Sequence, residues 1–393
     1  MCNEMIKILF ECYPKLLLKL FNAVLATGKV AQQWLIGMIV PIYKKGAKSD
    51  PSNYRGITLM SCLGKIFLSI LNARLLKYVT DKKILSKKQL GFLARNRTSD
   101  AHIIIHNMIR KYCHKRGQKI FCSFIDFSKA FDTIPRDILF TKLKGHGITG
   151  NFFNVIKNIY SNDKACIKMQ SQITKPFEIN TGVRQGCVLS PLLFNIFLAD
   201  LAKKFDEVKD QLKIGETDVN SIFWADDIIM FAKDESQLRE MLKILEDYSA
   251  ANKLQINTDK TKTMIFNKTG RFMRRAFYLD GVMLESVRSY KYLGFILTPS
   301  GEISSGLHDL KDRAFKAFLK IRNDLGAAFS HDIMTSLTLI DTLVKPILMY
   351  NSDFWGCLKL PKNNPIDTFH LKMCKQLLGV NKDTTTAGVL LEF

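Results

Sequence analysis

The stretch Ile222-Phe-Trp-Ala-Asp-Asp-Ile-Ile-Met-Phe-Ala232 places two adjacent carboxylates between two short apolar runs. The runs on either side are too short and too rich in aromatic and β-branched residues to form helices. They therefore predict a β-hairpin with Asp226 and Asp227 in its turn. Two like charges beside apolar side chains repel each other and lose hydration, and the stretch contains no Lys or Arg to neutralise them. Positive charge must come from elsewhere in the chain.

A second apolar run that ends in a carboxylate gives the Asp pair a functional context. Taken alone, an Asp pair is more often a solvated turn on a surface hairpin. Lys119 to Asp126, however, reads Lys-Ile-Phe-Cys-Ser-Phe-Ile-Asp, as expected of a buried strand with a functional carboxyl-terminal end. Three carboxylates converging from two such strands form a site for Mg²⁺, which takes oxygen ligands and is completed by water and substrate phosphates. Two such ions clamp the attacking and leaving oxygens of a phosphoryl transfer.

The composition describes a large and strongly basic folded protein. The 393 residues, of which 47% are hydrophobic and 10% aromatic, are enough for a large core, and the length predicts about two to three domains. The chain carries 58 Lys and Arg against 36 Asp and Glu, a formal net charge of +22. This excess predicts a polyanionic partner, but charge alone does not separate a nucleic acid from an acidic membrane surface.

The cysteines and the amino terminus indicate a reducing compartment. Nine cysteines are scattered without a Cys-x-x-Cys pair or a paired His spacing, so we expect reduced thiols and no zinc knuckle. Glu4, Glu11 and Lys19 interrupt the apolar residues near the amino terminus, which argues against a signal peptide or a membrane span. We therefore expect an intracellular protein that does not engage a membrane.

Three motifs in a fixed order resemble those of a known family. Asp126 is followed by Phe-Ser-Lys-Ala-Phe-Asp, Gly182 to Pro191 reads Gly-Val-Arg-Gln-Gly-Cys-Val-Leu-Ser-Pro, and Trp224 to Asp227 reads Trp-Ala-Asp-Asp. Their order and spacing resemble the palm motifs of reverse transcriptases of non-LTR (LINE-type, jockey-like) retrotransposons, over nearly the whole chain. The resemblance implies an α+β polymerase right hand with fingers, a palm built on an antiparallel sheet, and a helical thumb.

The resemblance also implies the domain organisation and the extent of the chain. We expect an N-terminal helical extension at 1–29, fingers at 30–118, and a palm at 119–300 with part of the fingers inserted near 145–180. The thumb and the start of a truncated C-terminal region are expected at 301–393. The chain is expected to begin midway along the longer reading frame of the family, without its upstream endonuclease, and to stop where the family continues.

The implied activity is that of an RNA-directed DNA polymerase, which extends a primer 3′ hydroxyl with dNTPs on an RNA template. Asp126, Asp226 and Asp227 would be the catalytic residues, bridging two Mg²⁺ ions for which Mn²⁺ is a substitute. The carbonyl of Phe127 would add a further metal ligand. Phe131, five positions beyond Asp126, would block a 2′ hydroxyl on the nucleotide, although ordinary core packing explains the same residue.

Further residues are assigned by resemblance to the substrates. Those expected at the nucleotide are Lys44, Arg55, Phe131, Arg184, Gln185, Gly186 and Lys260. Those expected against the primer and template are Trp224, Tyr292, Leu293 and Gly294, the last three within a hairpin at Tyr290 to Leu297 that resembles the primer grip. The family usually has Gly-Phe-Arg where this chain has Gly91-Phe92-Leu93, and Arg95 or Arg97 would then have to compensate.

Local patterns predict several helix ends. One or two amphipathic helices between Asn3 and Ala26 should end near Gly28. Ser190 should cap a helix with Pro191 in its first turn, and Asp234 should form a capping box with Gln237. An apolar stripe that begins at Leu307 predicts a thumb-like helix with a basic opposite face.

Two rival interpretations stay open. An RNA-dependent RNA polymerase or an intron-type maturase could share the palm carboxylates. A domesticated or truncated remnant could bind RNA through the basic surface and remain catalytically silent. If the chain is active, we expect it in a ribonucleoprotein with its RNA template, in the nucleus or the cytoplasm. The sequence leaves open the oligomeric state, the template RNA and the genomic target.

Overall fold

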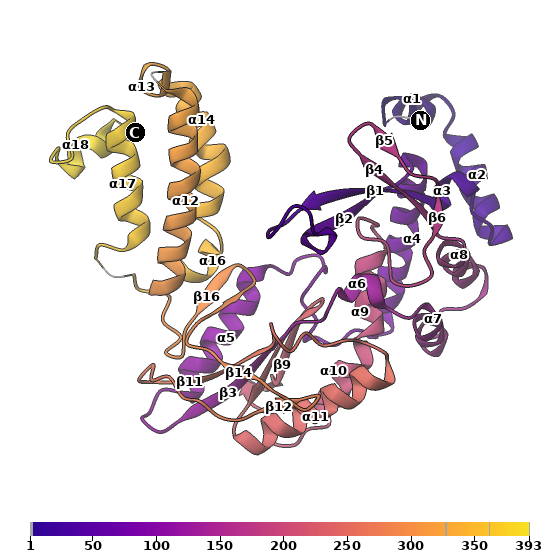
Figure 1. The fold of residues 1–393 in the computed structure, drawn as a ribbon, viewed down its shortest axis with the longest axis horizontal. Coiled ribbons are helices and arrows are strands. Elements are labelled where there is room, and N and C mark those ends of the chain that lie inside the picture. Colours follow the sequence, from indigo (N-terminus) through magenta and orange to yellow (C-terminus); the bar gives the residue numbers. More distant parts are fainter. Residues whose placement is uncertain (1–2, 327, 361, 393) are drawn as a thin grey trace.

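The computed structural model describes residues 3–326, 328–360 and 362–392. Met1, Cys2 and Phe393, at the outer ends of the terminal regions predicted above, lie outside the described residues, as do Ala327 and Pro361. Figure 1 shows a sheet at the bottom of the molecule, with the N-terminal helices and the strands β1 and β2 rising on one side and the C-terminal helices on the other. We refer to these three regions as palm, fingers and thumb, following the expected right hand.

The palm is built on an antiparallel core of long strands. Its sheet has the order β14-β11-β3-β10-β9, with β10 antiparallel to both β3 and β9. The strands are β3 (Lys119–Ile125), β9 (Ser221–Trp224), β10 (Asp227–Ala232), β11 (Lys262–Asn267) and β14 (Glu285–Ser286). Ile228 pairs with Ile125, so the next pair along the two strands would join Asp227 and Asp126. The predicted hairpin and the predicted buried strand are both confirmed.

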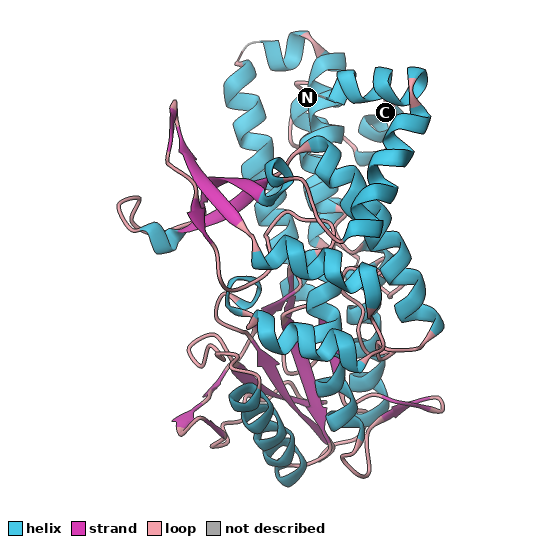
Figure 2. Ribbon diagram, turned by 90° about the vertical axis from the view of Figure 1, so that its right-hand side faces the viewer, coloured by secondary structure: helices cyan, strands magenta, loops and turns pink. Residues whose placement is uncertain are grey.

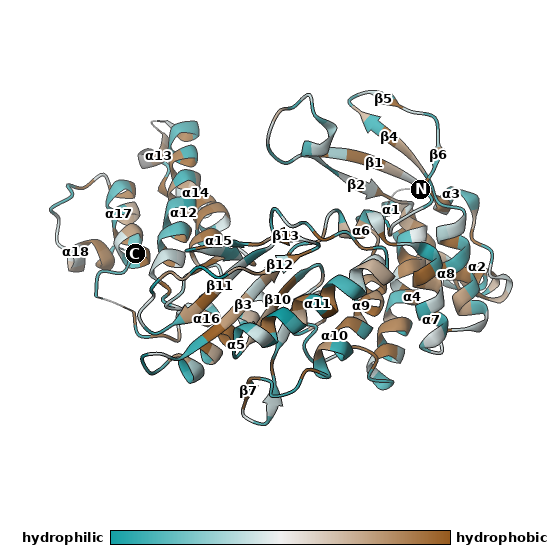
Figure 3. Cartoon of the chain, turned by 60° about the horizontal axis from the view of Figure 1, so that its bottom comes forward, coloured by the Kyte–Doolittle hydropathy of each residue, from teal (hydrophilic) through white to brown (hydrophobic). Residues whose placement is uncertain are grey.

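Both faces of the palm sheet are covered, which explains its nearly continuous apolar strands. Successive side chains of a strand point to opposite faces, so Ile120, Cys122 and Phe124 of β3 enter one hydrophobic cluster, whereas Phe121 and Ile125 enter another. Helix α5 (Thr98–Tyr112) covers the first face, although residues 30–118 were expected to be fingers. Helices α9 (Ser190–Phe197), α10 (Ala199–Asp206) and α11 (Glu235–Ala251) cover the second. The hydrophobic strands between these helices are brown in Figure 3.

The fingers combine a second sheet with a group of helices. Strand β1 pairs antiparallel with β2 and parallel with β4, so chain near residues 145–180 joins the amino-terminal hairpin. The strands are β1 (Ile36–Tyr43), β2 (Tyr54–Leu59), β4 (Lys164–Met169), β5 (Gln172–Ile173) and β6 (Phe177–Glu178). The helices are α1 (Asn3–Cys12), α2 (Pro14–Thr27), α3 (Gln32–Leu35), α4 (Cys62–Asp81), α7 (Arg136–Gly145) and α8 (Gly150–Ser161), with a short 3₁₀ turn at Pro51–Asn53. In Figure 2 this sheet projects to one side of the helices.

The thumb forms a third hydrophobic cluster around one long helix. Leu307, Leu310, Ala314 and Phe318 of α12 are buried in it, which confirms the predicted apolar stripe. The helices are α12 (Ser304–Leu325), α13 (Ala328–His331), α14 (Ile333–Leu339), a π-helix at Ile340–Val344, α15 (Lys345–Leu348), α16 (Ser352–Trp355), α17 (Pro365–Leu377) and α18 (Thr386–Leu391). Strands β15 (Tyr290–Tyr292) and β16 (Phe295–Leu297) form the hairpin between palm and thumb.

Short elements complete the structure. They are α6 (Ala130–Thr133), β7 (Lys213–Ile214), β8 (Thr217–Asp218), β12 (Tyr278–Leu279) and β13 (Val282–Met283). The eight cysteines within the described ranges are all free thiols, as expected, and Cys2 lies outside those ranges. Within the same ranges, no helix has both the length and the apolar character that crossing a bilayer requires.

Of the three predicted helix ends, the one at Gly28 is confirmed, the one at Asp234 is confirmed without its capping box, and the one at Ser190 is wrong. Helix α2 ends at Gly28, which adopts φ +69° and donates its N–H to the Val24 carbonyl. Asp234 caps α11 by accepting the Gln237 N–H, but the Gln237 side chain accepts from Lys233 rather than from Asp234, so no reciprocal capping box forms. The prediction that Ser190 is an N-cap is also wrong.

Ser190 is the first residue of α9, and Leu189 is the residue before it. The Ser190 hydroxyl instead lies 3.1 Å from the hydroxyl of buried Tyr160. A tertiary partner has therefore replaced the local capping bond that the sequence pattern favoured.

Candidate active site

The Asp pair lies at the tight turn between β9 and β10, partly in the turn and partly in the strand that follows it. Trp224 pairs with Asp227, so the turn itself consists of Ala225 and Asp226, and Ala225 adopts φ +57°. The expectation that both carboxylates lie in the turn is corrected here, because Asp227 is the first residue of β10. This position places Asp227 level with Asp126, which directly follows β3.

The electrostatics of Asp226 and Asp227 are set by burial and by neighbouring negative charge. Burial raises the pKa of Asp227 to about 6, and the negative charges of Asp226 and Asp126 add to this effect. Burial also raises the pKa of Asp226, and repulsion from Asp126 again contributes. The site therefore holds more negative charge than its surroundings stabilise, and it favours the uptake of a cation.

Lys260 is the cation nearest to these carboxylates. Its Nζ atom lies 3.2 Å from Oδ2 of Asp126, and its side chain is largely exposed. The backbone around Asp126 is held by the adjoining segment, because its N–H donates to the Thr261 hydroxyl at 3.3 Å and its carbonyl accepts from Asn257 at 2.8 Å. The structure thus brings Lys260, one of the residues expected at the nucleotide, beside the first carboxylate.

The fingers hairpin supplies two further positive charges. Lys44 directly follows β1, and Arg55 lies on β2 opposite Ile42. The charge of Lys44 lowers the pKa of Asp227, and that of Arg55 lowers the pKa of Asp226, although neither effect outweighs burial. Both residues therefore act on the carboxylates from the fingers hairpin, whereas Lys260 acts on them from the palm.

The donor set fits a hard divalent cation that is also bound by substrate. Within the described ranges, no three His, Cys, Asp or Glu side chains form a ready-made metal site. Mg²⁺ in sites of this chemistry is held by one or two carboxylates together with water and substrate phosphates. Phe127 and Ile256 form an isolated bridge through the Asp126 carbonyl and the Ser128 N–H, so the Phe127 carbonyl takes no part in those two bonds. The oxygen atoms present therefore suit Mg²⁺ or Mn²⁺.

Gln185 and Gly186 lie in a loop that passes close to strand β2. The Gln185 carbonyl accepts the Thr58 N–H at 2.8 Å, and its amide side chain donates to Oδ1 of Asp132 at 2.8 Å. Gly186 adopts φ +103°, and a Cβ atom there would lie 2.9 Å from the Thr58 carbonyl oxygen. Glycine is therefore required at this position. Asp132, which orients Gln185, was not among the predicted site residues.

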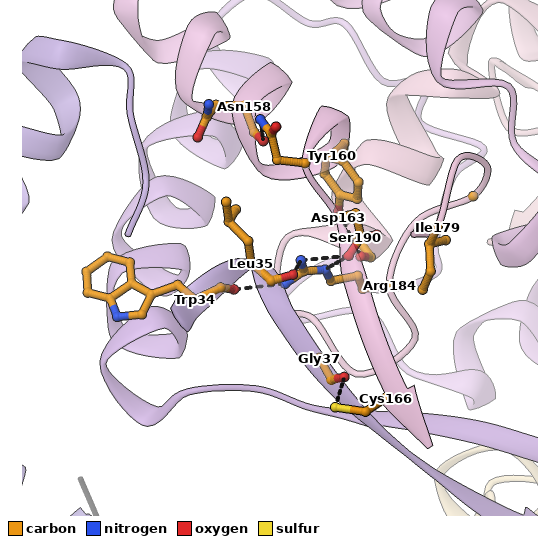
Figure 4. Close-up of polar contacts among 12 residues, drawn as sticks. Trp34, Leu35, Gly37, Asn158, Tyr160, Asp163, Cys166, Ile179, Arg184 and Ser190 are labelled. Atoms are coloured by element: carbon orange, nitrogen blue, oxygen red, sulfur yellow. Dashed lines mark hydrogen bonds and ion pairs between the residues drawn. The ribbon is translucent and has the colours of Figure 1, made fainter. Parts of the chain in front are cut away.

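Arg184, which precedes this loop, points into the interior. Its Nε donates to Oδ1 of Asp163 at 2.7 Å, and its guanidinium also donates to the carbonyls of Trp34 and Leu35 (Figure 4). The Arg184 residue is only 4% exposed. The expectation of a nucleotide contact from this side chain is corrected, because its donors are occupied by the protein itself.

A second buried arginine shares the same carboxylate. Arg136 at the start of α7 donates to Oδ2 of Asp163 at 2.7 Å and to the Gly182 carbonyl at 2.8 Å. Asp163 is 3% exposed, so one buried carboxylate forms ion pairs with two buried guanidinium groups. This triad holds the loop at Gly182, through Arg136, and at Arg184 itself. Asp163 lies outside the recognised motifs, and no local pattern marks it.

The segment at Gly91 supports the outer side of the catalytic hairpin. A Cβ atom at Gly91 would lie 2.6 Å from the backbone nitrogen of Ala225 and 2.9 Å from Cα of half-buried Trp224. Leu90 also donates its N–H to the Phe223 carbonyl at 2.8 Å. Arg97, a candidate to replace the missing arginine of the family pattern, instead pairs with Asp353 of the thumb at 2.6 Å.

Phe131 has one packed face and one accessible edge. Its ring stacks on buried Phe194 with centroids 4.8 Å apart, and exposed Phe92 meets it edge-on at 6.3 Å. Val183, just before the Gln185 loop, donates its N–H to the Phe131 carbonyl at 2.7 Å. Phe131 thus combines core packing with a position beside the site.

The hairpin at Tyr290–Leu297 forms as predicted, but the contact expected of the Tyr292 side chain is corrected. Tyr292 is 3% exposed, so its ring belongs to the core and cannot contact a primer. The carbonyls of Leu293 and Gly294 accept the Tyr350 hydroxyl at 2.8 Å and the Arg313 guanidinium at 3.0 Å, so this turn docks on the thumb.

Tyr290, by contrast, lies beneath the carboxylates and was not singled out. Its ring stacks on Phe124 with centroids 4.0 Å apart. Burial, followed by the charges of Asp227 and Asp126, raises the pKa of Tyr290 to about 12. The period-two alternation of Tyr290 and Tyr292 was the only sequence signal, and it does not distinguish the two tyrosines.

Comparisons with known proteins agree with this geometry. The sequence model of the family described as reverse transcriptase (RNA-dependent DNA polymerase) matches residues 42–297. The chain is 26% identical over 364 residues to the probable RNA-directed DNA polymerase from transposon BS of Drosophila melanogaster, covering 90% of this chain and 39% of that protein. It is 25% identical over 390 residues to the RNA-directed DNA polymerase from mobile element jockey of Drosophila funebris, covering 96% and 41%.

A solved structure shares the fold. Apo telomerase from Candida tropicalis matches with a TM-score of 0.53 and 15% identity, over 92% of this chain and 64% of that one. The predicted α+β polymerase right hand is thereby confirmed. The chain spans about two fifths of the length of the two curated relatives, at 39% and 41%.

The buried triad yields a stability prediction. Asp163→Asn should lower the free energy of unfolding by ~3–5 kcal/mol, because it leaves two buried guanidiniums without their counter-ion. Thermal unfolding measures this loss, and amide hydrogen exchange should rise at Gly182–Gly186. The control is Asp218→Asn, which removes an exposed partner of Lys213 at 3.5 Å and should cost no more than ~1 kcal/mol. Equal effects of the two substitutions would contradict the assigned role.

The raised pKa of Asp227 predicts a pH-dependent stability. Between the ordinary value of 3.8 and about 6, the folded chain holds a proton at Asp227 that the unfolded chain has released. Its contribution to stability is therefore complete below the lower value and is lost as pH rises through the higher one. Asp227→Asn cannot ionise and does not lose this contribution. The melting temperature of the variant minus that of the parent should therefore increase as pH rises from about 4 to about 7. Parallel melting curves across that range would argue against the proposed repulsion.

Proposed function

The chain belongs to the reverse transcriptase (RNA-dependent DNA polymerase) family, and from this premise we propose that it extends a primer 3′ hydroxyl with dNTPs on an RNA template, as part of a non-LTR retrotransposon. One observation carries the proposal. Asp126 and Asp227 lie level with each other at the ends of the adjacent strands β3 and β10, and Asp226 lies in the turn that joins β9 to β10. The repulsion among these carboxylates favours a bound cation. The activity of any longer protein that contains this chain is part of the same proposal.

The carboxylates fit the role of metal ligands in a two-ion phosphoryl transfer. Two Mg²⁺ ions, when bound, would supply positive charge to the attacking primer oxygen and to the departing pyrophosphate. Asp126, Asp226 and Asp227 would hold that charge, with the Phe127 carbonyl as a further ligand. Their fixed places at strand ends keep the reacting groups in register, which is the larger part of catalysis in this chemistry.

The cations around the carboxylates suit the triphosphate. Lys44 and Arg55 on the fingers hairpin would bind its phosphates, since both already act on Asp227 and Asp226 from that side. Lys260, whose Nζ lies 3.2 Å from Oδ2 of Asp126, would donate a proton to the departing pyrophosphate. Gln185, oriented by Asp132, and the side-chain-free backbone of Gly186 would meet the base pair between template and incoming nucleotide.

The wider surroundings suit a primer and a template. Trp224 is half-buried beside the turn that holds Asp226, where a nucleic acid strand would pass. Residues 1–29 would form an N-terminal helical extension, 30–118 and 145–180 most of the fingers, the rest of 119–300 the palm, and 301–393 the thumb with the start of a C-terminal region. By their packing, α5 would count with the palm and α7 with the fingers. The +22 chain would act within a ribonucleoprotein.

Primer extension on an RNA template tests the proposed function. With Mg²⁺, the parental protein should incorporate dNTPs, and Asp126→Asn or Asp226→Asn should lower the rate by more than ~100-fold, because losing a metal ligand costs more than the ~10–100-fold lost with a residue that only hydrogen-bonds such a ligand. Asp218→Asn, an exposed carboxylate remote from the site, is the matched control.

Binding of template–primer should be measured on the same proteins. Normal binding with abolished extension assigns the carboxylates to the chemistry. Extension at the parental rate by either variant would refute the metal site. A parental protein that binds RNA but never extends a primer would identify the catalytically silent remnant instead.

Phe131 yields a prediction about sugar selection. Phe131→Val should raise incorporation of ribonucleotides relative to deoxyribonucleotides. The smaller valine side chain, near Gln185, would no longer block the 2′ hydroxyl of the incoming nucleotide. The stability loss should stay below the ~3–5 kcal/mol of truncating a fully buried phenylalanine, since one edge of the ring is accessible. Competing rNTP and dNTP incorporation measures the first effect and thermal unfolding the second. An unchanged preference in a folded, active variant would assign Phe131 to core packing alone.

A further inference from the structure

Two neighbouring segments of the palm carry positive charge and no acidic residue. Between Asp100 and Asp126 the chain contains five Lys or Arg residues and no Asp or Glu, and between Asp259 and Asp280 it contains six and none. The first segment leads into β3 and the second contains β11, and these two strands pair. The sheet therefore places two acid-free segments side by side.

The basic residues gather at the end of these strands that is remote from the carboxylates. Lys119 at the start of β3 pairs with Asn267 at the end of β11. Asp126 is seven residues further along β3, which corresponds to ~23 Å of extended chain. Figure 1 shows this strand pair running away from the fingers toward the opposite edge of the palm. The basic end is thus separate from the proposed active site.

A hollow lies between the two segments. Its volume is about 420 Å³, and its basic lining residues are Arg116, Lys119, Lys268 and Arg271. Among residues 3–326, 328–360 and 362–392, no Asp or Glu lines it. We call these four residues the palm-edge cations.

The loops that carry the palm-edge cations are closed by their own hydrogen bonds. Asn267 is 5% exposed, and its side chain accepts the Arg271 N–H at 3.1 Å and donates to the Arg271 carbonyl at 2.9 Å. On the other wall, the Gln118 side chain accepts the Lys115 N–H at 3.1 Å. Because both loops are already ordered, little entropy would be lost when they bind a ligand.

The palm-edge cations lack the partners that nearby basic residues have. Lys260, Lys262 and Arg275 each form an ion pair, at 3.2, 2.6 and 2.6 Å. Over the part of the chain that the structure describes, none of the four palm-edge cations lies within 4.0 Å of a carboxylate oxygen in an ion pair. Their charge is left for an external anion.

We propose that the palm-edge cations bind the phosphates of a nucleic acid strand outside the active site, without regard to base sequence. Four cations over two adjacent loops match a repeating polyanion better than a single phosphate. Met273 is the only large apolar residue of the lining, which argues against insertion into a membrane surface. The site goes beyond the proposed polymerase reaction, and its test requires no synthesis.

The test is a binding assay with the active site already filled. A short unlabelled hairpin primer–template in excess occupies the active site, and labelled single-stranded RNA or double-stranded DNA is then titrated at several salt concentrations. Lys268→Ala/Arg271→Ala should weaken binding several-fold at low salt and reduce the salt slope by about one per lost contact. The two probes show whether an RNA or a DNA strand is the preferred source of the phosphates.

The matched control removes two charges elsewhere on the palm. Lys203 and Lys204 are exposed on α10, so Lys203→Ala/Lys204→Ala has the same net charge as the test variant. Extension of the short hairpin and the melting temperature should be unchanged in both. If the test variant unfolds, Lys268→Gln/Arg271→Gln replaces it.

Two results would overturn the proposal. The first is an equal loss of binding in the test and control variants, which would mean that only net charge matters. The second is found by titrating the same proteins with vesicles of anionic lipid: the test variant would lose binding to the vesicles while its binding to RNA and DNA stayed unchanged. Failure of primer extension with these binding results intact would instead count against the polymerase function alone.

Discussion

The repulsion among three carboxylates is the constraint on which the rest of the structure depends. The pairing of Ile228 with Ile125 brings Asp227 level with Asp126, and the turn adds Asp226. Burial and mutual repulsion then raise the pKa of Asp227 to about 6. Bringing these charges together is unfavourable for folding. The apolar strands behind them are covered on both faces, and the free energy gained by burying this large core offsets that cost.

Three cations reach this site from two separate segments of the chain. Lys260 comes from the turn before β11, and Lys44 and Arg55 come from the fingers hairpin. The fingers and the palm are in turn joined by Asp163, which binds Arg136 and Arg184 in the interior. That triad fixes the loop of Gln185 relative to both parts. The geometry of the site therefore depends on a buried charge cluster that never meets the substrates.

Charge is used differently at the two ends of the palm strands. At one end, the carboxylates face cations that only partly neutralise them, which suits a metal-bound triphosphate. At the other end, no carboxylate of the described residues lines the hollow of the palm-edge cations, which suits phosphates alone. An excess of 58 Lys and Arg over 36 Asp and Glu is thus an organised property of the fold, because strand pairing brings the acid-free segments together.

The sequence by itself determined the parts that depend on neighbouring residues. The hairpin around Asp226, the strand before Asp126 and the stripe of α12 follow from short apolar periodicities, and the motif order identified the family. Only the tertiary structure decided that Arg184 is buried, that Tyr292 is core while Tyr290 lies beneath the carboxylates, and that Lys260 meets Asp126. The physical reason is distance along the chain. Lys260 and Asp126 are 134 residues apart, and Arg184 and Asp163 are 21 apart, so only folding selects these partners.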